Sequence, residues 1–499
     1  PVTLLHGEDG GAHLGVDGES KPYRSTDLYA AVKGIDFIID GHSHTVMTKG
    51  ENGEPIQSTG TAFANIGVIV IDDATKKIES NSLFEIKEDT AKDATVAAAA
   101  QKIIDRIDKE YGAVFAKSEV ELNGAKAPNG NRDSETNNGD LITDAMVWKI
   151  LQDKESLTVD ADHVVAVTNG GGIRKAINPG DVTKKNINEV LPFGNTVVTI
   201  YITGAELLEA LEASTYCTPD AIGGFPQVSG INYTISTAVA YDANAETYPA
   251  STYYGPKSIN RVTINSINGK EFKADDTYAV ITNNFLAAGG DTYYAFASAS
   301  AQFDTGIPLD EALMDYITAE LKGVIGKQYA APQGRILMNP FADVKASSWF
   351  GKYVIDLYND GIINGTSATT YAPNNTLTWA AALKLLLVSN GDLKAADATG
   401  ADWSKNAIAK AAELGLVAAD LDGAKAISRL EFCQVAAKLN KLAESKTESK
   451  FTDCTDGYVM ALVDAKVISG MTETTFEPAA SLTRAQIAKI LYQLTLIEK

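Results

Sequence analysis

The last third of the chain repeats itself, and an internal repeat restricts the possible folds more strongly than any other feature of a sequence. A Thr or Ser followed by a helical pattern occurs three times, at Thr378, Ser428 and Thr483, with spacings of 50 and 55 residues. An aromatic residue followed by an aspartate precedes the first and third copies, at 341–343 and 451–453. Spacings of this size are typical of helical repeat units. The pattern predicts an all-α domain of three repeats, at 341–390, 398–440 and 451–496.

The whole chain has 499 residues, a length that accommodates about three domains. Apolar residues make up 45% and charged residues 21%, which is typical of a folded globular protein and excludes a wholly disordered chain. The net charge of −21 argues against a nucleic-acid polymer as partner, because such a chain gains nothing from counterion release. The apolar runs at 66–71 and 383–388 are far shorter than the roughly 18 residues that span a bilayer, so no transmembrane segment is predicted.

Two histidine-bearing loops follow short apolar runs near the start of the sequence. Val2–Leu5 and Ile35–Ile39 are expected to be buried strands of an α/β or layered β segment; His6 follows the first, and His42 and His44 follow the second. Two histidines two positions apart at a strand end project from the same face, so both imidazoles can reach one metal ion. The alternative for this loop is a solvated turn with no ligand.

An amphipathic helix is predicted at Thr95–Tyr111, where apolar residues recur every three or four positions among Asp, Lys and Arg. We expect it to be a connector, spanning 89–115, between the segment at 1–88 and a second α/β domain at 116–339. In that second domain Val164–Val167 reads as a buried strand, and a glycine-rich loop follows it.

The glycine-rich loop is Asn169-Gly170-Gly171-Gly172-Ile173-Arg174. Glycines let backbone amides approach an anion, and Arg174 supplies a forked charge that suits phosphate. No Gly-Lys-Ser/Thr follows, so the loop is not a P-loop, and Lys175 stands where a dinucleotide fingerprint needs its third glycine. A tight turn without a ligand is the alternative.

Together with four further motifs, this loop resembles the C-terminal domain of 5'-nucleotidases. The five motifs lie at 131–142, 169–174, 191–194, 225–230 and 284–291, with Asp140 where the family usually has Asn. The resemblance implies that two phenylalanines sandwich the nucleobase, an aspartate binds the ribose hydroxyls, and arginines hold phosphate. The residues matched to substrate binding are Arg132, Asn169, Gly171, Arg174, Phe193, Phe285 and Asp291.

The first 88 residues resemble the C-terminal part of the calcineurin-like metallophosphoesterase domain of the same family, which ends in a strand-end His and a GHxH motif. His6, His42 and His44 match these metal ligands, whereas His13 matches none. The family holds two divalent ions, Zn, Mn or Co, with further ligands from DxH, GD and GNHD/E motifs that lie upstream of the matched segment. The resemblance therefore implies a partial metallophosphoesterase α/β sandwich, missing its N-terminal half through truncation, processing or a partial record, and inactive on its own.

The repeats at the end of the chain resemble S-layer homology (SLH) modules, which bind pyruvylated secondary cell-wall polysaccharide. The family's T-R-A-E element supplies an arginine for the anionic ketal, and it corresponds to Arg429 and Arg484 in the second and third copies. The first copy has Trp379 instead, so we leave open whether it binds polysaccharide. Weaker candidates for polysaccharide binding are Asp343, Trp349 and Asp453, for which helix capping and interhelical packing are the alternatives.

The three cysteines, Cys217, Cys433 and Cys454, do not describe a disulfide framework or a zinc site. Cys433 lies in a helical pattern at Arg429–Leu439, where a small buried hydrophobe is expected. A Cys433–Cys454 disulfide is the alternative if the chain is exported.

These resemblances predict an α/β multidomain protein, an extracellular 5'-nucleotidase anchored to the cell wall or S-layer of a Gram-positive-type bacterium. It would hydrolyse nucleotide phosphoesters by a two-metal mechanism. One alternative is a non-catalytic nucleotide-binding or S-layer surface protein. Another is an enzyme of the same family that acts on 2',3'-cyclic nucleotides or UDP-sugars.

Overall fold

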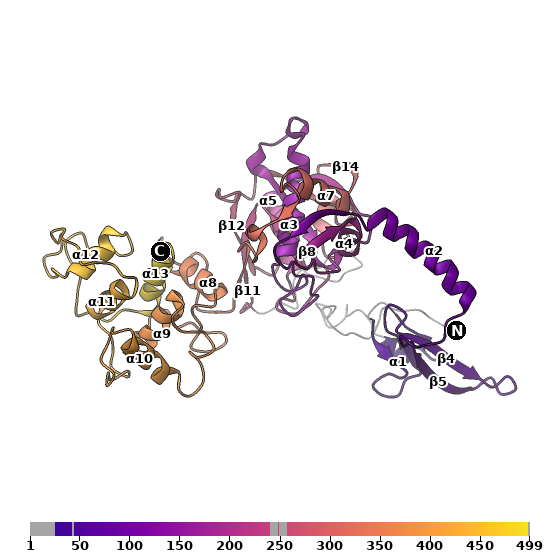
Figure 1. The fold of residues 1–499 in the computed structure, drawn as a ribbon, viewed down its shortest axis with the longest axis horizontal. Coiled ribbons are helices and arrows are strands. Elements are labelled where there is room, and N and C mark those ends of the chain that lie inside the picture. Colours follow the sequence, from indigo (N-terminus) through magenta and orange to yellow (C-terminus); the bar gives the residue numbers. More distant parts are fainter. Residues whose placement is uncertain (1–24, 42–43, 240–247, 249–256, 498–499) are drawn as a thin grey trace. The chain divides into compact units, whose positions relative to one another are not determined.

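The computed structural model describes residues 25–41, 44–239, 248 and 257–497 (Figure 1). The chain divides into two compact units. One consists of Pro1–Tyr233 with Tyr241–Ile336, and the other of Thr234–Ala240 with Leu337–Lys499. Among the described residues, no helix combines the length and the apolar character that crossing a membrane requires.

The first described segment is a small α/β element. Its helix and strands are α1 (Ser25–Ala31), β1 (Ile38–Ile39), β2 (Val46–Met47), β3 (Ile56–Thr59), β4 (Asn65–Ile71) and β5 (Ile78–Glu85). β3 lies between β1, which is parallel to it, and β2, which is antiparallel, while β4 and β5 form an antiparallel hairpin. Of the strand predicted at Ile35–Ile39, only Ile38–Ile39 is extended. The strand predicted at Val2–Leu5, together with His6, His13 and His42, lies outside the described residues.

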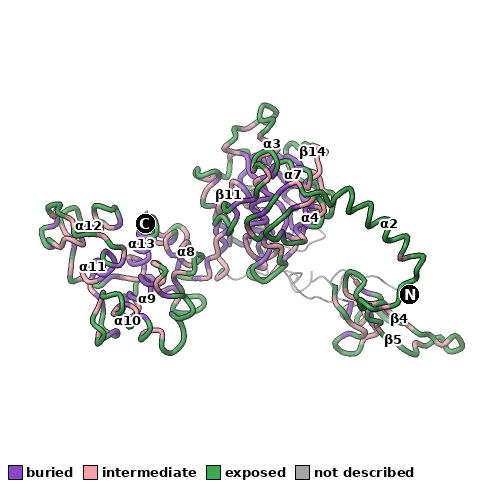
Figure 2. The backbone as a smooth tube through the Cα atoms, viewed as in Figure 1, coloured by how far each residue is buried: buried purple, intermediate pink, exposed green. Residues whose placement is uncertain are grey.

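The predicted connector is helix α2 (Ala94–Tyr111), which begins one residue before the predicted start. The Asp93 side chain caps it by accepting a hydrogen bond of 2.9 Å from the Val96 amide. None of its residues is buried, and the helix is exposed along its length (Figure 2). The apolar residues that recur every three or four positions therefore form an exposed stripe.

The second α/β domain, which we call the lobe, is built on a five-stranded sheet with the order β10-β7-β13-β9-β14. The strands are β7 (Val164–Asn169), β9 (Thr196–Thr203), β10 (Pro226–Ser229), β13 (Thr277–Asn283) and β14 (Ala301–Pro308). β7 and β13 are parallel, and the other pairs are antiparallel. Every residue of β7 is buried, as its continuous apolar run predicts for a strand covered on both faces.

Helices and two smaller sheets complete the lobe. The helices are α3 (Asn137–Leu151), α4 (Lys184–Val190), α5 (Gly204–Ser214), α6 (Asn284–Ala287) and α7 (Leu309–Ala319). The smaller sheets have the orders β15-β6-β8 and β12-β11-β16, formed by β6 (Val114–Ser118), β8 (Gly180–Thr183), β11 (Ile231–Ser236), β12 (Val262–Ile267), β15 (Val324–Ile325) and β16 (Ile336–Asn339). Short 3-10 helices occur at Lys154–Ser156, Ala161–His163, Gly170–Gly172, Tyr294–Ser298 and Lys327–Tyr329. α3 contacts β7, β10 and α7, and their buried side chains form the core of the lobe.

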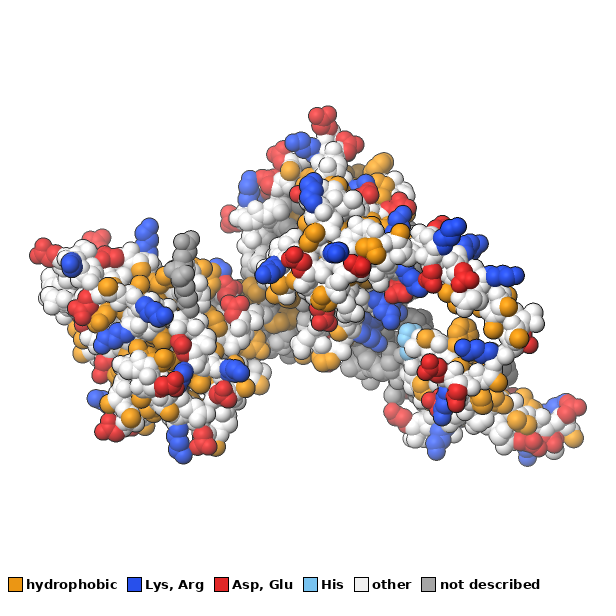
Figure 3. Space-filling model, in the orientation of Figure 1, with side chains coloured by type: hydrophobic (Ala, Val, Ile, Leu, Met, Phe, Trp, Pro, Cys, Tyr) orange, Lys and Arg blue, Asp and Glu red, His pale blue; other side chains and the backbone are white. Residues whose placement is uncertain are grey.

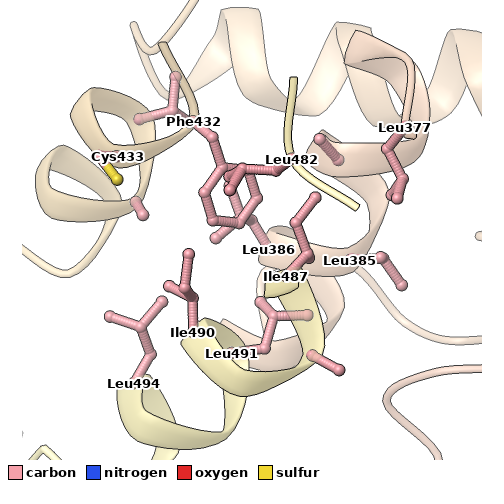
Figure 4. Close-up of a cluster of buried hydrophobic side chains, with 14 of the residues drawn as sticks. Leu377, Leu385, Leu386, Phe432, Cys433, Leu482, Ile487, Ile490, Leu491 and Leu494 are labelled. Carbon is pink, nitrogen blue, oxygen red and sulfur yellow. The ribbon is translucent and has the colours of Figure 1, made fainter. Parts of the chain in front are cut away.

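The part of the second compact unit from Phe341 onward, which we call the repeat unit, is helical. Its helices are α8 (Gly351–Asn359), α9 (Trp379–Asn390), α10 (Trp403–Glu413), α11 (Arg429–Leu439), α12 (Gly457–Asp464) and α13 (Arg484–Thr495). Side chains from the second helix of each repeat share one core, including Leu386 of α9, Phe432 of α11 and Leu491 of α13 (Figure 4). Acidic and basic side chains are interspersed over the visible face of this unit (Figure 3).

The three aligned Thr and Ser residues all cap helices. The hydroxyls of Thr378, Ser428 and Thr483 accept hydrogen bonds from backbone amides in the first turns of α9, α11 and α13. The segments that carry these caps pair with one another in a ring, through bridges between Thr378 and Ala426, Ser428 and Ser481, and Thr376 and Thr483. The divergent middle copy therefore occupies the same structural position as the other two.

The cysteines of the repeat unit are free thiols. Cys433 lies in α11 and Cys454 lies before α12, and both are buried. Burial, foremost among the causes, raises the pKa of the Cys433 thiol to about 12. The expectation of a buried thiol at Cys433 is confirmed, and the alternative Cys433–Cys454 disulfide is not formed in the structure.

Candidate functional site

Parallel pairing of β7 and β13 determines where the polar side chains of the lobe gather. Ile281 of β13 pairs with Ala166 of β7, so both strands end at the same edge of the sheet. Asn169 ends β7 and Asn283 ends β13. Strand ends of this kind are where α/β folds place ligand-binding loops.

The Asn169 side chain joins two strand ends and the loop that carries Asp291. Its Nδ2 donates to Asp291 Oδ2 at 2.8 Å, and its Oδ1 accepts from Asn283 Nδ2 at 3.2 Å. Asn169 and Asp291 are each 6% exposed. Asp291 has a positive φ of 51°, so its backbone is held in the left-handed region. The two predicted site residues Asn169 and Asp291 are therefore joined by a hydrogen bond.

The glycines of the 169–174 loop serve close backbone packing, which differs from the expected role of free amides facing an anion. The Gly170 amide donates to the Phe225 carbonyl at 2.8 Å, and the Gly171 amide donates to the Gly223 carbonyl at 2.7 Å. A Cβ at Gly170 would lie 1.6 Å from the Asn131 carbonyl oxygen. Only glycine permits this approach, which seats the loop against the segment that carries Arg132.

Arg174 follows the glycines and lies against Phe193. Its guanidinium carbon is 5.5 Å from the centroid of the Phe193 ring, and its Nη1 donates to the Gly171 carbonyl at 3.1 Å. Phe193 is nevertheless 58% exposed. A large aromatic ring with a cation beside it and this much exposed surface is suited to stacking on a flat ligand.

Phe285 lies in the one-turn helix α6 and is 43% exposed. A Cβ at Gly290 would lie 2.6 Å from the Phe285 ring, so the glycine backbone supports this side chain. The loops before β9 and after β13 are joined where the Thr196 amide donates to Asn284 Oδ1 at 3.3 Å. Because Asn283 pairs with Val197, the loops that carry Phe193 and Phe285 leave the sheet at the same edge.

A pocket lies at this edge of the sheet. Its lining comprises Thr168, Gly172, Leu191, Phe193, Asn195, Asn283, Leu309 and Asp310. The lining combines aromatic and aliphatic side chains with the amide groups of Asn195 and Asn283.

The loop that carries Arg132 is held by hydrogen bonds to Gln227, a fully buried side chain. Gln227 Nε2 donates to the carbonyls of Asn131 at 3.1 Å and Ser134 at 2.7 Å, and its Oε1 accepts from the Thr136 amide at 3.0 Å. The Arg132 carbonyl accepts from the Ile222 amide at 2.9 Å. The backbone that presents Arg132 is thereby fixed on both sides.

A group of charged side chains surrounds the buried Asp140 of α3. Arg335 Nη2 lies 2.8 Å from the Asp144 carboxylate, and its Nη1 lies 3.6 Å from Asp140. Asp140 Oδ1 and Glu135 Oε1 are buried without a hydrogen-bond donor. Burial of Asp140, and next the nearby Glu135 carboxylate, raise the pKa of Asp140 to about 8, although Arg335 acts in the opposite direction.

In the repeat unit, the two candidate arginines lie at the joints of the ring. The Arg429 guanidinium carbon is 4.6 Å from the Phe476 ring centroid, and its Nη2 donates to the Ser469 carbonyl at 2.8 Å. Arg484 stacks at 4.3 Å on Tyr371 and donates through Nε to the Tyr371 carbonyl at 2.7 Å. Each arginine therefore joins its own repeat to the next one in the ring.

The weaker candidates have partners within their own repeat. The Asp343 carboxylate accepts from the amides of Tyr371 and Ala372, and the Asp453 carboxylate accepts from those of Phe476 and Glu477. Both aspartates thus hold the loop before the capped helix. Trp349 is 58% exposed and makes an edge contact with Phe350 at 5.4 Å between ring centroids.

Of the predicted metal ligands, only His44 belongs to the described residues, and its side chain is exposed. His6 and His42 lie outside them. Within residues 25–41, 44–239, 248 and 257–497, no group of three or more His, Cys, Asp and Glu side chains is arranged to hold a metal ion.

Two polar residues of the lobe, Asn283 and Gln227, were not among the predicted site residues. Gln227 belongs to the 225–230 motif, and Asn283 directly precedes the 284–291 motif, where an Asn before a short helix is a capping signal. Each acts through contacts with segments distant in the sequence, which periodicity and spacing do not reveal.

Comparison with known proteins identifies both units. The family described as 5'-nucleotidase, C-terminal domain, matches residues 114–298, and the family described as S-layer homology domain matches residues 340–382 and 453–488. The first match covers four of the five strands of the sheet and all the candidate site residues of the lobe, whereas β14 and the pocket residues Leu309 and Asp310 lie beyond it. The second covers the first and third repeats.

Similar proteins include the trifunctional nucleotide phosphoesterase protein YfkN of Bacillus subtilis (strain 168), which is 33% identical over 333 residues, or 63% of this chain and 20% of YfkN. The snake venom 5'-nucleotidase of Macrovipera lebetinus is 26% identical over 64% of this chain and 81% of that protein. Among solved structures, the 5'-nucleotidase precursor from Thermus thermophilus has a TM-score of 0.45 and 27% identity, covering 62% of this chain and 60% of that one. The chain thus spans one fifth of the length of YfkN.

The lobe is therefore a nucleotidase-type α/β domain, and the helical unit contains repeats of the S-layer type. Residues 114–298 thus match the C-terminal domain of 5'-nucleotidases, and the chain also carries SLH domains, which indicate association with the cell surface.

Proposed function

We propose that the lobe binds a nucleotide and that the chain is part of a cell-surface 5'-nucleotidase, which hydrolyses nucleotide phosphoesters. The observation that carries this proposal is the group of side chains at the edge of the sheet. The exposed Phe193 ring lines the pocket there and lies beside Arg174, and Asn169 and Asp291 are joined by a hydrogen bond. The domain match and the names of the relatives support the same activity class.

Each part of a nucleotide has a matching group at this edge. Phe193 and Phe285 would stack on the two faces of the base, because aromatic rings accept any base face. The Asp291 carboxylate would accept hydrogen bonds from the ribose diol, and Arg132 and Arg174 would hold phosphate. Asn169 would orient Asp291 through the 2.8 Å bond between them.

Two divalent ions, Zn, Mn or Co, would supply a metal-activated water and polarise the phosphoryl oxygens when bound. We propose His6, His42 and His44 as ligands, because imidazole suits all three metals. Three imidazoles cannot hold two divalent ions and also neutralise their charge, so the part that we assign to this chain is nucleotide binding.

The stacking role is tested by nucleotide affinity. Replacing Phe193→Ala and Phe285→Ala together should weaken AMP binding in isothermal titration calorimetry by about 2–6 kcal/mol, the value of two base–aromatic stacks. The matched control is Phe303→Ala, which removes a phenylalanine of the same lobe that is 65% exposed and does not line the pocket. Unchanged affinity in the double variant would overturn the proposed binding mode.

Activity is tested separately. Phosphate release from AMP, from 2',3'-cyclic nucleotides and from UDP-sugars with added Mn, Co or Zn would identify the substrate class. We expect little turnover from this chain alone, because three imidazoles cannot hold both ions. Binding without turnover under every condition, also in the protein with the family's complete set of metal motifs, would favour a non-catalytic nucleotide-binding surface protein.

For the repeat unit, we propose binding to an anionic secondary cell-wall polysaccharide through Arg429 and Arg484, and a cell-wall or S-layer location in a Gram-positive-type bacterium. Guanidinium groups suit the carboxylate of a pyruvyl ketal. Arg484→Gln should reduce retention on purified cell walls, with thermal unfolding as the control for folding. Full retention in both Arg429→Gln and Arg484→Gln would contradict this role.

A further inference from the structure

Asn283 lies between the two parts of the proposed nucleotide site, the turn that carries Phe285 and the Asn169–Asp291 pair. It is 1% exposed, ends β13 and caps α6, the turn that carries Phe285. Its Oδ1 accepts from the Leu286 amide at 2.9 Å. Its Nδ2 donates to Asn169 Oδ1 at 3.2 Å and to Thr168 Oγ1 at 3.1 Å.

Both polar atoms of the Asn283 side-chain amide therefore make hydrogen bonds, and each atom stabilises a different segment. The oxygen holds the turn on which the base-stacking ring is mounted. The nitrogen fixes the amide of Asn169, because an Asn169 Oδ1 that accepts from Asn283 leaves Asn169 Nδ2 directed to Asp291. An amide held in one orientation at both ends loses little entropy when a ligand binds.

We propose that Asn283 is a positioning residue that couples the Phe285 turn to the Asn169–Asp291 pair, so that base stacking and ribose recognition are set by one side chain. The coupling rests on the proposed nucleotide site. Asn283 acts through Asn169 and through the α6 turn, and it is not required to touch the ligand.

Two substitutions separate the two tasks. Asn283→Ser retains a hydroxyl that can cap α6 but is too short to reach Asn169, so it should affect ribose recognition alone. Asn283→Ala removes both the cap and the link, and should weaken base stacking as well. Asn268→Ser is the matched control, because Asn268 Nδ2 also donates two hydrogen bonds, to the Asp162 and Val164 carbonyls at the opposite end of β7.

The readout is the ratio of the dissociation constants of 3'-deoxyadenosine and adenosine, measured by calorimetry on the full chain. This ratio reports the contact between Asp291 and the ribose diol. We expect Asn283→Ser to reduce it by roughly tenfold while leaving 3'-deoxyadenosine binding nearly unchanged, since a hydrogen bond to a charged group has about this value. A general loss of stability, as in Asn268→Ser, would not move the ratio.

A ligand-free measurement distinguishes failure of the coupling from failure of the proposed function. In a crystal structure of Asn283→Ser, the Asn169 amide should turn and lose its bond to Asp291. If Asn169 and Asp291 remain bonded as in the parent, or if the ratio is unchanged, the coupling is overturned. If the parent chain does not bind adenosine, the proposed nucleotide site fails, and the crystal structure alone decides whether Asn283 orders the pair.

Discussion

The lobe and the repeat unit both place an arginine over an aromatic ring, but they leave different parts of the pair accessible. In the lobe, Arg174 lies 5.5 Å from Phe193, and that ring is 58% exposed. In the repeat unit, Arg429 lies 4.6 Å from Phe476, a ring with no exposed surface. One pair has an aromatic face available to a ligand, whereas the other closes a joint between repeats.

The difference shows that the same pair of residue types serves two purposes, according to what surrounds it. Phe193 lies in a loop at the edge of a sheet, where its ring stays accessible to solvent. Phe476 lies inside the helical ring, and the backbone carbonyl of Ser469 takes one of the hydrogen bonds of the arginine. One ionisable group that the lobe buries, Asp140, lies in α3 and is not part of the pocket lining.

The largest expected effect concerns that buried charge in the lobe. Because the pKa of Asp140 is raised to about 8, the folded protein keeps a proton that the unfolded chain has already released above about pH 4. Stability of the lobe should therefore fall as pH rises from about 4 to about 8, by at most about 1.4 kcal/mol per pH unit. In Asp140→Asn the side chain has no titrating proton, so this dependence should disappear.

Scanning calorimetry between pH 4 and 9 measures this effect. The Asn variant should match the parent near pH 4 and exceed it increasingly up to about pH 8. Glu119→Gln, which changes an exposed carboxylate of the same lobe, serves as the control and should follow the parent. Parallel curves for the parent and Asp140→Asn would show that the buried acid does not carry a proton.

The second prediction tests the comparison of the two arginines directly. Arg429→Ala should lower the unfolding free energy of the repeat unit by about 2–4 kcal/mol, because it removes a charged hydrogen bond and a buried cation–π contact. Arg174→Ala should change the stability of the lobe by less than about 1 kcal/mol, since its partner ring is exposed. Urea unfolding followed by tryptophan fluorescence suits the repeat unit, which contains Trp349, Trp379 and Trp403. Equal losses of unfolding free energy in the two variants would show that the two arginines contribute alike to stability.

The smallest expected effect is on thiol chemistry in the repeat unit. With Cys433 and Cys454 free and buried, dithiothreitol should leave the melting temperature unchanged within about 1 °C, whereas losing a disulfide would cost about 2–4 kcal/mol. The Cys433 thiol, whose pKa is raised to about 12, should react slowly with a disulfide reagent at pH 8 until denaturant is added. A clear drop in melting temperature on reduction would show that the two cysteines pair.

Local sequence patterns predicted much of the fold. The helix expected at Arg429–Leu439 has those bounds in α11, and the strand expected at Val164–Val167 forms the first four residues of β7. These elements follow from periodicity and from capping residues, which act within a few positions along the chain. The alignment of the repeats likewise led to Thr378, Ser428 and Thr483, which the structure uses as equivalent caps.

The candidate site was less predictable in its details. The motifs indicated Asn169 and Asp291, but not that they bond to each other or that Asn283 orients them. The glycine motif suggested amides open to an anion, whereas Gly170 and Gly171 donate to carbonyls of a segment more than 50 positions later. Such contacts depend on strand register and on close backbone approach, which no local pattern encodes.

By itself, the sequence determined which segments become helices and strands, how often the helical unit repeats, and which known domains the lobe and the repeats resemble. The tertiary structure alone decided which aromatic ring stays exposed, which arginine is committed to a joint, and which amide orients Asp291. The physical reason is the distance along the chain over which each effect acts. Propensity, periodicity and capping act between neighbours in the chain, whereas burial and hydrogen-bond direction are settled only when distant segments pack together.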